Sequence, residues 1–420
     1  MAVFLPHSNP IFYNNITCCF SQNIVDMNSL NYIFFGNRCS FFPLIQQYYP
    51  AEAFEFLKIY KYLQQLALNI ENILPQSLKF LQQMDTFNTI KLTRRQVALL
   101  FMLSFFGVIP QSFNNKLNNF DVSQVLYAKN GTKFEFARCF LNYLTIIGKW
   151  ISQNNSILEE QIIYVREFIN KNSWNLGNMN LINLCQVNFI THGSLTEGNA
   201  SYVVDFANKK IGGGTLTGGC VQEEILFATQ PEAIVAMLFM EEMSDLDAIG
   251  IFNTIKYSNY QGYKNTFSYN GSCINDWNSN IQRYRIIAID ASTNDKQLNM
   301  VDNITYQNII NRDIFKALAG FYLINSEMNF VKSIATGNWG CGVYNGIHEL
   351  KFIEQWIAAS FAGVQRLDYY TFNNQEMQNA IQCYEFIKTK FSASGLYRAL
   401  IYNKLDMNNL IQILVNGQFQ

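Results

Sequence analysis

Two neighbouring glutamates, Glu223 and Glu224, end a glycine-rich run that reads IGGGTLTGGCVQEEI over residues 211–225. Glycine lets a backbone approach a ligand closely, and this run leads from a β-rich stretch into an apolar helix. A Walker A loop would need Lys after the last glycine, and a dinucleotide fingerprint would need glycine at Thr217, so both loop types are excluded. What remains is a turn that brings two carboxylates to a helix N-terminus. Plain capping of that helix is an equally open interpretation.

A second glycine-rich segment, residues 336–346, reads TGNWGCGVYNG and also follows a β-rich run. It contains no Lys or Arg, so it could bind an anion through backbone N–H groups alone. Such a loop suits a diphosphate, whereas a merely tight turn is the alternative if the segment is taken by itself. Two such loops at strand-to-helix turns of one sheet favour a shared function, because loop amides and helix N-termini there face a common side.

Short β-rich runs and helix-length segments alternate in the second half of the chain, which is typical of an α/β layered sheet. The expected strands are 187–190, 202–206, 248–252, 285–290, 331–335 and 367–371. The expected helices are 232–242, 307–323, 347–362, 375–390 and 393–403.

The first part of the chain is predicted to be mainly helical. Between residues 51 and 74, Ile and Leu recur at alternating steps of four and three, which places them on one stripe of a helix that Pro75 closes. Residues 93–109 and 157–169 have the same pattern and are also predicted to be helices. Nothing in this region suggests chemistry.

The composition indicates an ordered globular chain. Of 420 residues, 49% are hydrophobic and 15% charged, and the formal net charge of -1 gives no strong field to attract nucleic acid. Nine Cys without a C-x-x-C pair give neither a disulfide framework nor a zinc spacing, which favours a reducing nucleocytoplasmic compartment. No signal peptide and no membrane span are predicted.

Taken together, these motifs resemble those of the poly(ADP-ribose) glycohydrolase family. The resemblance rests on the triple glycine followed by Gln-Glu-Glu and runs from about residue 93 to 372, with supporting matches at 204–208, 257–263, 336–342 and 369–372. It implies an α/β fold, a macrodomain-like mixed sheet flanked by helices, preceded by a mainly α-helical accessory region. The expected domains are 1–180, the helical accessory region, and 181–420, the catalytic macrodomain-like part with C-terminal helices.

The resemblance also implies roles for the two glutamates. Glu224 would be the general acid that protonates the departing ribose oxygen and then the base that activates water, while Glu223 binds ribose hydroxyls with help from Asn208. Ordinary glycosidases place two carboxyls across the scissile bond, but neighbours on a helix diverge by about a quarter turn and cannot flank one bond symmetrically. Because a helix N-terminus lowers the pKa of a carboxyl group, an acid here needs apolar surroundings to offset that effect.

Further substrate-binding residues carry over from the same resemblance. The diphosphate loop would contain Gly340, Cys341 and Gly342, and Tyr344 stands beside the distal ribose where the family usually has Phe, so its hydroxyl could add a hydrogen bond. The remaining expected contacts are the loop residues Gly213, Gly214 and Gln222, the aromatic Tyr263 and Phe372 around the ADP portion, and Glu197 near the adenine edge.

The leading hypothesis is therefore an enzyme that hydrolyses poly(ADP-ribose) without a metal or other cofactor. Its expected partners are poly(ADP-ribose) and ADP-ribosylated proteins, with no direct nucleic-acid or membrane binding, as a monomer in the nucleus or cytoplasm. The main alternative is a non-catalytic macrodomain that only binds ADP-ribose, and a helical scaffold with an inert α/β domain is the third. Retention of Gln222, Glu223 and Glu224 argues against the binding-only alternative.

Overall fold

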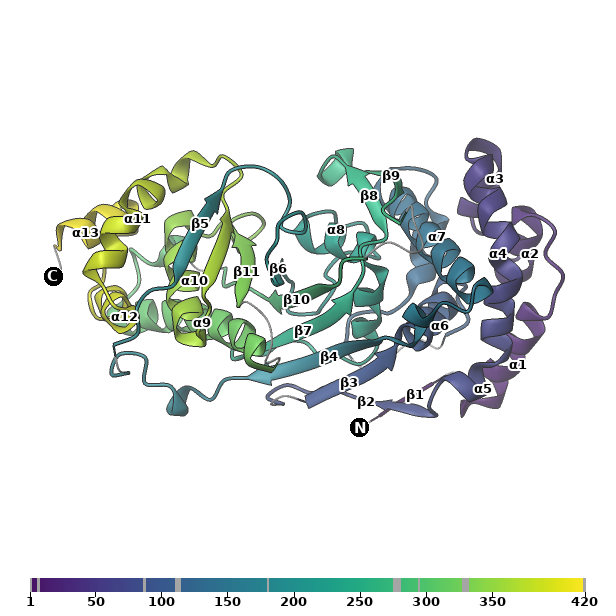
Figure 1. Ribbon diagram of the computed structural model, residues 1–420, viewed down its shortest axis with the longest axis horizontal. Helices are drawn as coiled ribbons and strands as arrows, with labels where there is room; N and C mark the ends of the chain where they lie inside the picture. Colours follow the sequence, from purple (N-terminus) through teal and green to yellow (C-terminus); the bar gives the residue numbers. More distant parts are fainter. Residues whose placement is uncertain are drawn as a thin grey trace.

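The computed structural model describes residues 2–5, 8–85, 88–109, 115–179, 181–274, 281–293, 295–326 and 332–417. A bundle of N-terminal helices lies at one end of an elongated molecule and the last helices lie at the other, with a large sheet between them (Figure 1). The N-terminal helices are α1 (Pro10–Phe20), α2 (Met27–Phe35), α3 (Phe41–Tyr48), α4 (Pro50–Leu68), α5 (Ile70–Ile73), α6 (Arg94–Phe105) and α7 (Gly131–Ser152).

The central sheet has eight strands in the order β3-β4-β7-β10-β6-β11-β12-β5. The five strands from β10 to β5 are parallel to one another, and β7, β4 and β3 continue the sheet in antiparallel pairs. Their bounds are β3 (Asn88–Thr93), β4 (Gln161–Phe168), β7 (Asp247–Thr254), β10 (Tyr284–Ile289), β6 (Tyr202–Phe206), β11 (Ser333–Gly337), β12 (Arg366–Tyr370) and β5 (Gln186–Ile190).

Helices cover both faces of this sheet. Strands that are buried on both faces lack polar alternation, and β10 shows this, since Ile286 joins the core on one side and Ile287 the core on the other. One core also contains α6, α7 and α8 (Gln222–Thr229), and the other contains α9 (Asn303–Tyr322) and α10 (His348–Ala362). The C-terminal helices α11 (Gln378–Lys390), α12 (Ala393–Tyr402) and α13 (Leu410–Asn416) extend the second core.

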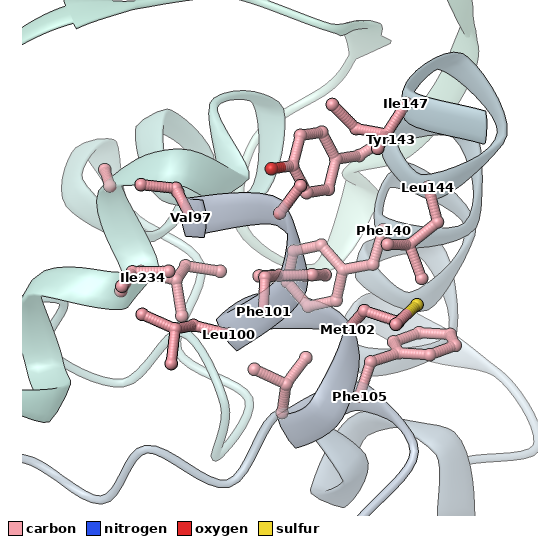
Figure 2. Close-up of a cluster of buried hydrophobic side chains, with 14 of the residues drawn as sticks. Val97, Leu100, Phe101, Met102, Phe105, Phe140, Tyr143, Leu144, Ile147 and Ile234 are labelled. Atoms are coloured by element: carbon pink, nitrogen blue, oxygen red, sulfur yellow. The ribbon is translucent and has the colours of Figure 1, made fainter. Parts of the chain in front are cut away.

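Helix α6 joins the N-terminal helices to the sheet. Figure 2 shows Val97 and Leu100 of α6 directed toward Ile234, while Phe101 faces Phe140 of α7. The rings of Phe101 and Phe140 meet edge to face at 5.3 Å, an arrangement that aromatic pairs prefer. Every residue of α6 from Val97 to Phe105 is buried, so the helix is the centre of a core shared by both parts of the molecule.

Two short antiparallel pairs complete the fold. Strand β1 (Ala2–Phe4) pairs with β2 (Ser77–Lys79), and β8 (Ser258–Gln261) pairs with β9 (Ser268–Ser272) in a hairpin beside α7 (Figure 1).

No helix in the described part of the chain is long and apolar enough to cross a membrane.

The predicted α/β class and all six predicted strands are confirmed, with ends shifted by at most two residues. The predicted helix over 157–169 is wrong, because this segment forms a 3-10 turn and strand β4. Its Ile and Val positions fit a helical stripe, yet β-branched residues also favour a strand that is covered on both faces. The segment 232–242 is a 3-10 helix over Pro231–Leu238 rather than an α-helix. The helix over 51–74 is interrupted at Asn69.

Candidate active site

The parallel strands all end at one edge of the sheet, and every site residue predicted from the sequence lies there or on the hairpin β8–β9. Ligands of open α/β sheets bind beyond the carboxyl ends of the strands. The loops at this edge are 191–197 after β5, 207–221 after β6, 290–293 after β10, 338–347 after β11 and 371–374 after β12. Because β6 and β11 are neighbours, the two glycine-rich loops lie side by side at this edge.

Backbone N–H groups hold the Glu223 carboxylate from two sides. The N–H of Gly212 donates to Oε1 at 2.7 Å, and the N–H of Asn208 donates to Oε2 at 2.9 Å. The side chain is only 2% exposed. One carboxylate therefore joins the loop after β6 to the first turn of α8.

The Glu224 carboxylate is held in the same way by other amides. Gly214 donates its N–H to Oε1 at 2.9 Å, and Val221 donates its N–H to Oε2 at 2.8 Å. Because Val221 is the N-cap residue of α8, Glu224 does cap the helix. Capping was the second interpretation that the sequence left open for this pair of glutamates. Each oxygen accepts one N–H and keeps a second lone pair, so capping leaves the carboxyl group able to exchange a proton.

Gly213 separates the two carboxylates. Its φ of +47° lies in the left-handed region, and a Cβ at this position would collide with Glu223 and stand 2.7 Å from Glu224 Oε1. Although the two side chains leave the helix about a quarter turn apart, their oxygens converge on this one residue. Only glycine fits between them, which explains the middle glycine of the run.

Sequence reasoning missed a third carboxyl group, that of Asp205 on β6. It is fully buried, and neither oxygen has a hydrogen-bond partner among the described residues. Burial, reinforced by the charge of Glu224, raises the pKa of Asp205 well above its usual range. An acidic residue inside the apolar run YVVDF was the sequence signal, because an unpaired buried carboxyl is costly unless it has a use.

The pKa of Glu223 is also raised well above its usual range. Burial is the main cause and the neighbouring Asp205 adds to it, while the N–H groups of Asn208 and Gly212 act in the opposite direction. Buried surroundings thus outweigh the hydrogen bonds from the loop amides at the Glu223 carboxyl.

Gln222 contacts the protein backbone through both ends of its amide. Its Oε1 accepts the N–H of Phe206 at 2.8 Å, and its Nε2 donates to the carbonyl of Val204 at 3.0 Å. These bonds fix α8 to the end of β6 and leave the glutamates at the sheet edge. The structure thus gives Gln222 a role in positioning α8. Its expected role in substrate binding stays a prediction.

The loop after β11 keeps several amides unpaired. Gly340 has φ +73°, its carbonyl accepts the N–H of Gly346, and a Cβ on it would stand 2.5 Å from that of Ala291. At Gly342, by contrast, a Cβ would meet no atom within 4 Å. Among the described residues, none accepts a hydrogen bond from the N–H groups of residues 342–344. This loop could bind an anion through those amides.

Cys341 does not have the properties of a nucleophile. Burial raises the pKa of its thiol, which keeps it protonated, and Sγ lies 3.4 Å from the carbonyl oxygen of Trp339. The residue instead forms part of the turn, since its N–H donates to the carbonyl of Asn338.

A buried cluster of charged side chains, formed by Lys351, Asp295, Asp313 and Glu354, is bonded to the end of this loop. Lys351 of α10 places Nζ 3.0 Å from Asp295 Oδ2 and 3.0 Å from Glu354 Oε2, and it also pairs with Asp313 of α9. Asp295 Oδ2 accepts the N–H of Ile347 at 3.2 Å, which links the cluster to the last residue of the loop. Sequence reasoning missed this cluster because its members come from separate elements.

Tyr344 of the loop after β11 lies near Asn208 of the loop after β6. Burial is the main cause that raises the pKa of Tyr344, and the charges of Asp290 and Glu223 add to it, while the nearby Asn208 side chain acts in the opposite direction. Asn208 also donates its backbone N–H to Glu223. The hydrogen bond expected from the Tyr344 hydroxyl stays a prediction.

The two predicted aromatic contacts lie on different elements and are half exposed. Tyr263 is 50% exposed in the turn of the β8–β9 hairpin, and Phe372 is 49% exposed after β12, with its ring 6.3 Å from that of Tyr370. Glu197 accepts the N–H of Ser194 at 3.0 Å in the loop after β5. After burial and Asp368, the charge of Glu197 also contributes to the raised pKa of Tyr370. Half-exposed rings present a free face on which a base could stack.

No cluster of three or more His, Cys, Asp or Glu side chains in the described ranges could hold a metal ion. The fold and the site together define an α/β protein of the macrodomain type with an acidic glycine loop.

Comparison with known proteins identifies the family. The family model for the macrodomain fold of poly(ADP-ribose) glycohydrolase matches residues 173–379, and the model for its helical domain matches residues 50–166. The chain therefore belongs to the poly(ADP-ribose) glycohydrolase family.

Individual relatives carry the same name. The chain is 28% identical over 363 residues to a probable poly(ADP-ribose) glycohydrolase 2 of Arabidopsis thaliana, a match that covers 74% of this chain and 68% of that protein. It is 32% identical over 267 residues to poly(ADP-ribose) glycohydrolase 1 of the same plant, covering 47% of this chain and 48% of the relative.

Solved structures of bacterial poly(ADP-ribose) glycohydrolases are also similar. The enzyme of Thermomonospora curvata is 15% identical with a TM-score of 0.32, covering 46% of this chain and 72% of that one. The enzyme of Deinococcus radiodurans in complex with ADP-ribose is 11% identical with a TM-score of 0.32, covering 52% of this chain and 84% of the other.

Proposed function

We propose that this chain cleaves the ribose–ribose O-glycosidic bonds of poly(ADP-ribose), free or attached to proteins, and releases ADP-ribose. The observation that carries the proposal is the pair of buried carboxylates, Glu223 and Glu224, which backbone N–H groups hold around Gly213 beside a loop with unpaired amides. A protein that only binds ADP-ribose would need the unpaired amides but would have no use for an acid. Family membership supports the same activity.

In this mechanism, the Glu224 carboxyl gives its proton to the departing ribose oxygen as the glycosidic C–O bond breaks. The electron pair of that bond leaves with the oxygen, and the sugar passes through an oxocarbenium-like state. A water molecule then adds to the sugar and returns a proton to the Glu224 carboxylate, so the residue ends as it began. Two backbone amides fix the side chain throughout, so little orientation is lost before the reaction.

The surrounding groups would place the substrate. Glu223 and the Asn208 side chain offer acceptors and donors for ribose hydroxyls. The amides of residues 342–344 suit the diphosphate, and the rings of Tyr263 and Phe372 are exposed enough to cover the adenosine portion.

The test compares Glu224→Gln with wild type on poly(ADP-ribose). The variant keeps the shape of the side chain but cannot donate a carboxyl proton, so kcat should fall by about 10² to 10⁴. ADP-ribose affinity, measured by calorimetric titration, should stay close to wild type. Glu385→Gln, an exposed carboxylate on α11, is the matched control and should leave both quantities unchanged.

Two results would contradict the proposal. Near wild-type turnover by Glu224→Gln would remove the assigned acid. A wild-type chain that binds ADP-ribose but releases none from the polymer would instead identify a binding-only macrodomain.

A further inference from the structure

One side chain of the helical region, that of Asn118, hydrogen-bonds to the backbone of the glycine loop after β6. This residue lies between α6 and the 3-10 helix Val122–Tyr127 and is half buried. Its Nδ2 donates to the carbonyl of Ile211 at 3.0 Å and to the carbonyl of Gly213 at 3.0 Å. Because an amide nitrogen carries two hydrogens, both are used in these bonds.

The two carbonyls belong to the peptide groups that hold the glutamates. The carbonyl of Ile211 and the N–H of Gly212 form one planar peptide unit, and that N–H donates to Glu223 at 2.7 Å. The carbonyl of Gly213 shares its peptide unit with the N–H of Gly214, which donates to Glu224 at 2.9 Å. In a trans peptide the oxygen and the hydrogen point in opposite directions, so a bond that fixes one orients the other.

We propose that Asn118 is the positioning residue for both candidate catalytic glutamates, acting through these two peptide groups. One amide nitrogen of the helical region sets the planes of the Ile211–Gly212 and Gly213–Gly214 peptides, whose hydrogens set Glu223 and Glu224. The inference rests on the proposed function, because it assigns the role by which these carboxylates are positioned.

The flexibility of the loop explains the need for such a residue. Gly212 and Gly213 have φ of +84° and +47°, and glycine peptides rotate easily unless a partner holds them. A hydrogen bond at each carbonyl also polarises the peptide and strengthens the bond that its N–H donates.

The segment that carries Asn118 is itself firmly anchored. Leu117 and Phe120 on either side are buried. The hydroxyl of Ser104 on α6 donates to the carbonyl of Phe120 at 3.1 Å and accepts the N–H of Val122 at 2.9 Å. On the other side, Lys210 Nζ reaches the carbonyl of Asn115 at 2.5 Å. The amide of Asn118 is therefore held against the loop from the α6 core.

Two variants of Asn118 and one neighbour test the proposal. Asn118→Asp keeps the size of the side chain but places oxygen against two carbonyls, and Asn118→Ala removes the contact. Asn119→Asp is the matched control, because its side chain is exposed and adds the same charge one residue away. The variants are compared by kcat and KM on poly(ADP-ribose), by thermal melting, and by hydrogen exchange of the Gly212 and Gly214 amides.

We expect Asn118→Asp to lower kcat about 100-fold and Asn118→Ala about tenfold, with KM within threefold, since a displacement of about 1 Å can cost 10² in rate. The Gly212 and Gly214 amides should exchange faster in both variants, while Asn119→Asp behaves as wild type.

Unchanged kcat and unchanged exchange in folded Asn118 variants would overturn the inference. So would a loss of melting temperature with normal kcat per folded enzyme, which would mark a merely structural contact. If Asn118→Asp does not fold, Asn118→Ala decides by the same measurements. Should wild type itself fail to cleave polymer, the proposed function falls, and the exchange of the two glycine amides still decides whether Asn118 holds the loop.

Discussion

The two glycine-rich loops have similar composition and follow neighbouring parallel strands, yet their amides are used in opposite ways. In the loop after β6, the N–H groups of Gly212 and Gly214 are already bonded to carboxylates of the same chain. In the loop after β11, the N–H groups of residues 342–344 have no acceptor in the described part of the chain. The first loop is organised by carboxyl groups of the same chain, whereas we propose that the second receives an anion from outside.

This difference teaches that glycine content alone does not identify an anion-binding loop. Glycine serves the first loop by making room for two carboxylates and the second by allowing a turn over a buried ionic cluster. The partner of each amide decides the role. Variants of the two loops should therefore fail in different ways, the first in turnover and the second in affinity.

The largest effect is expected for Gly213→Ala in the first loop. The added Cβ would collide with Glu223 and press on Glu224, so kcat should fall by at least about 100-fold while ADP-ribose affinity changes less. Kinetics on poly(ADP-ribose) and calorimetric titration measure the two effects. Gly36→Ala has a similar φ of +56° but meets no atom within 4 Å, so it reproduces the backbone strain alone. Equal loss of affinity in Gly213→Ala would erase the contrast between the loops.

A smaller effect of the other kind is expected for Gly340→Ala in the second loop. Its φ of +73° and the approach to Ala291 impose strain of about 1–3 kcal/mol, which should weaken ADP-ribose binding about tenfold and leave kcat at saturating polymer nearly unchanged. Gly363→Ala, which has a similar φ of +77° and open space at its Cβ, is the matched control for titration. If Gly340→Ala binds ADP-ribose like wild type, the loop does not hold the diphosphate.

The smallest effect concerns Asp205, which lies on β6 directly before the first loop. Its pKa is raised by burial in the folded protein, so above about pH 4, where an unfolded Asp ionises, stability is lost as pH rises. Asp205→Asn removes this dependence, so the variant should be more stable than wild type at pH 7. The gain should be only about 1 kcal/mol, because the buried amide would also lack hydrogen-bond partners. The difference should vanish below pH 4.

Urea unfolding of wild type and Asp205→Asn across that pH range checks the sign. The opposite result would be a variant that is less stable than wild type at pH 7 and equal to it at pH 4. That result would show that the Asp205 carboxylate is ionised and paired in the folded chain. Polymer cleavage by the same variant reports whether the buried carboxyl also serves the reaction.

Local pattern was sufficient for the sheet and for the acidic loop. Runs such as YVVDF and the spacing from the triple glycine to Glu224 depend on neighbours in sequence, and the structure places them as strand, turn and helix. The strand β4 was mistaken for a helix because its β-branched residues are buried on both faces, which removes the alternation that marks a strand.

Contacts between distant residues could not be predicted in this way. Asn118 and Ile211 are separated by 93 positions, and Lys351 and Asp295 by 56. No periodicity connects such pairs, and a single Asn or Lys in a loop or helix has many unremarkable uses. Asp205 is an intermediate case, since its position inside an apolar strand was visible in the sequence although its use was not.

Strands β3 and β4 have a consequence for the molecule as a whole. Both precede the matched macrodomain segment, which begins at residue 173, yet β4 pairs with β7 over six residues from Ile163 to Phe168. A fragment that started at residue 173 would leave the edge of β7 open, with a row of unpaired backbone groups and apolar side chains facing solvent. Open edges of this kind recruit other chains and promote aggregation. By covering the edge of β7, strands β3 and β4 therefore also protect the part of the chain that carries the glutamates from aggregation.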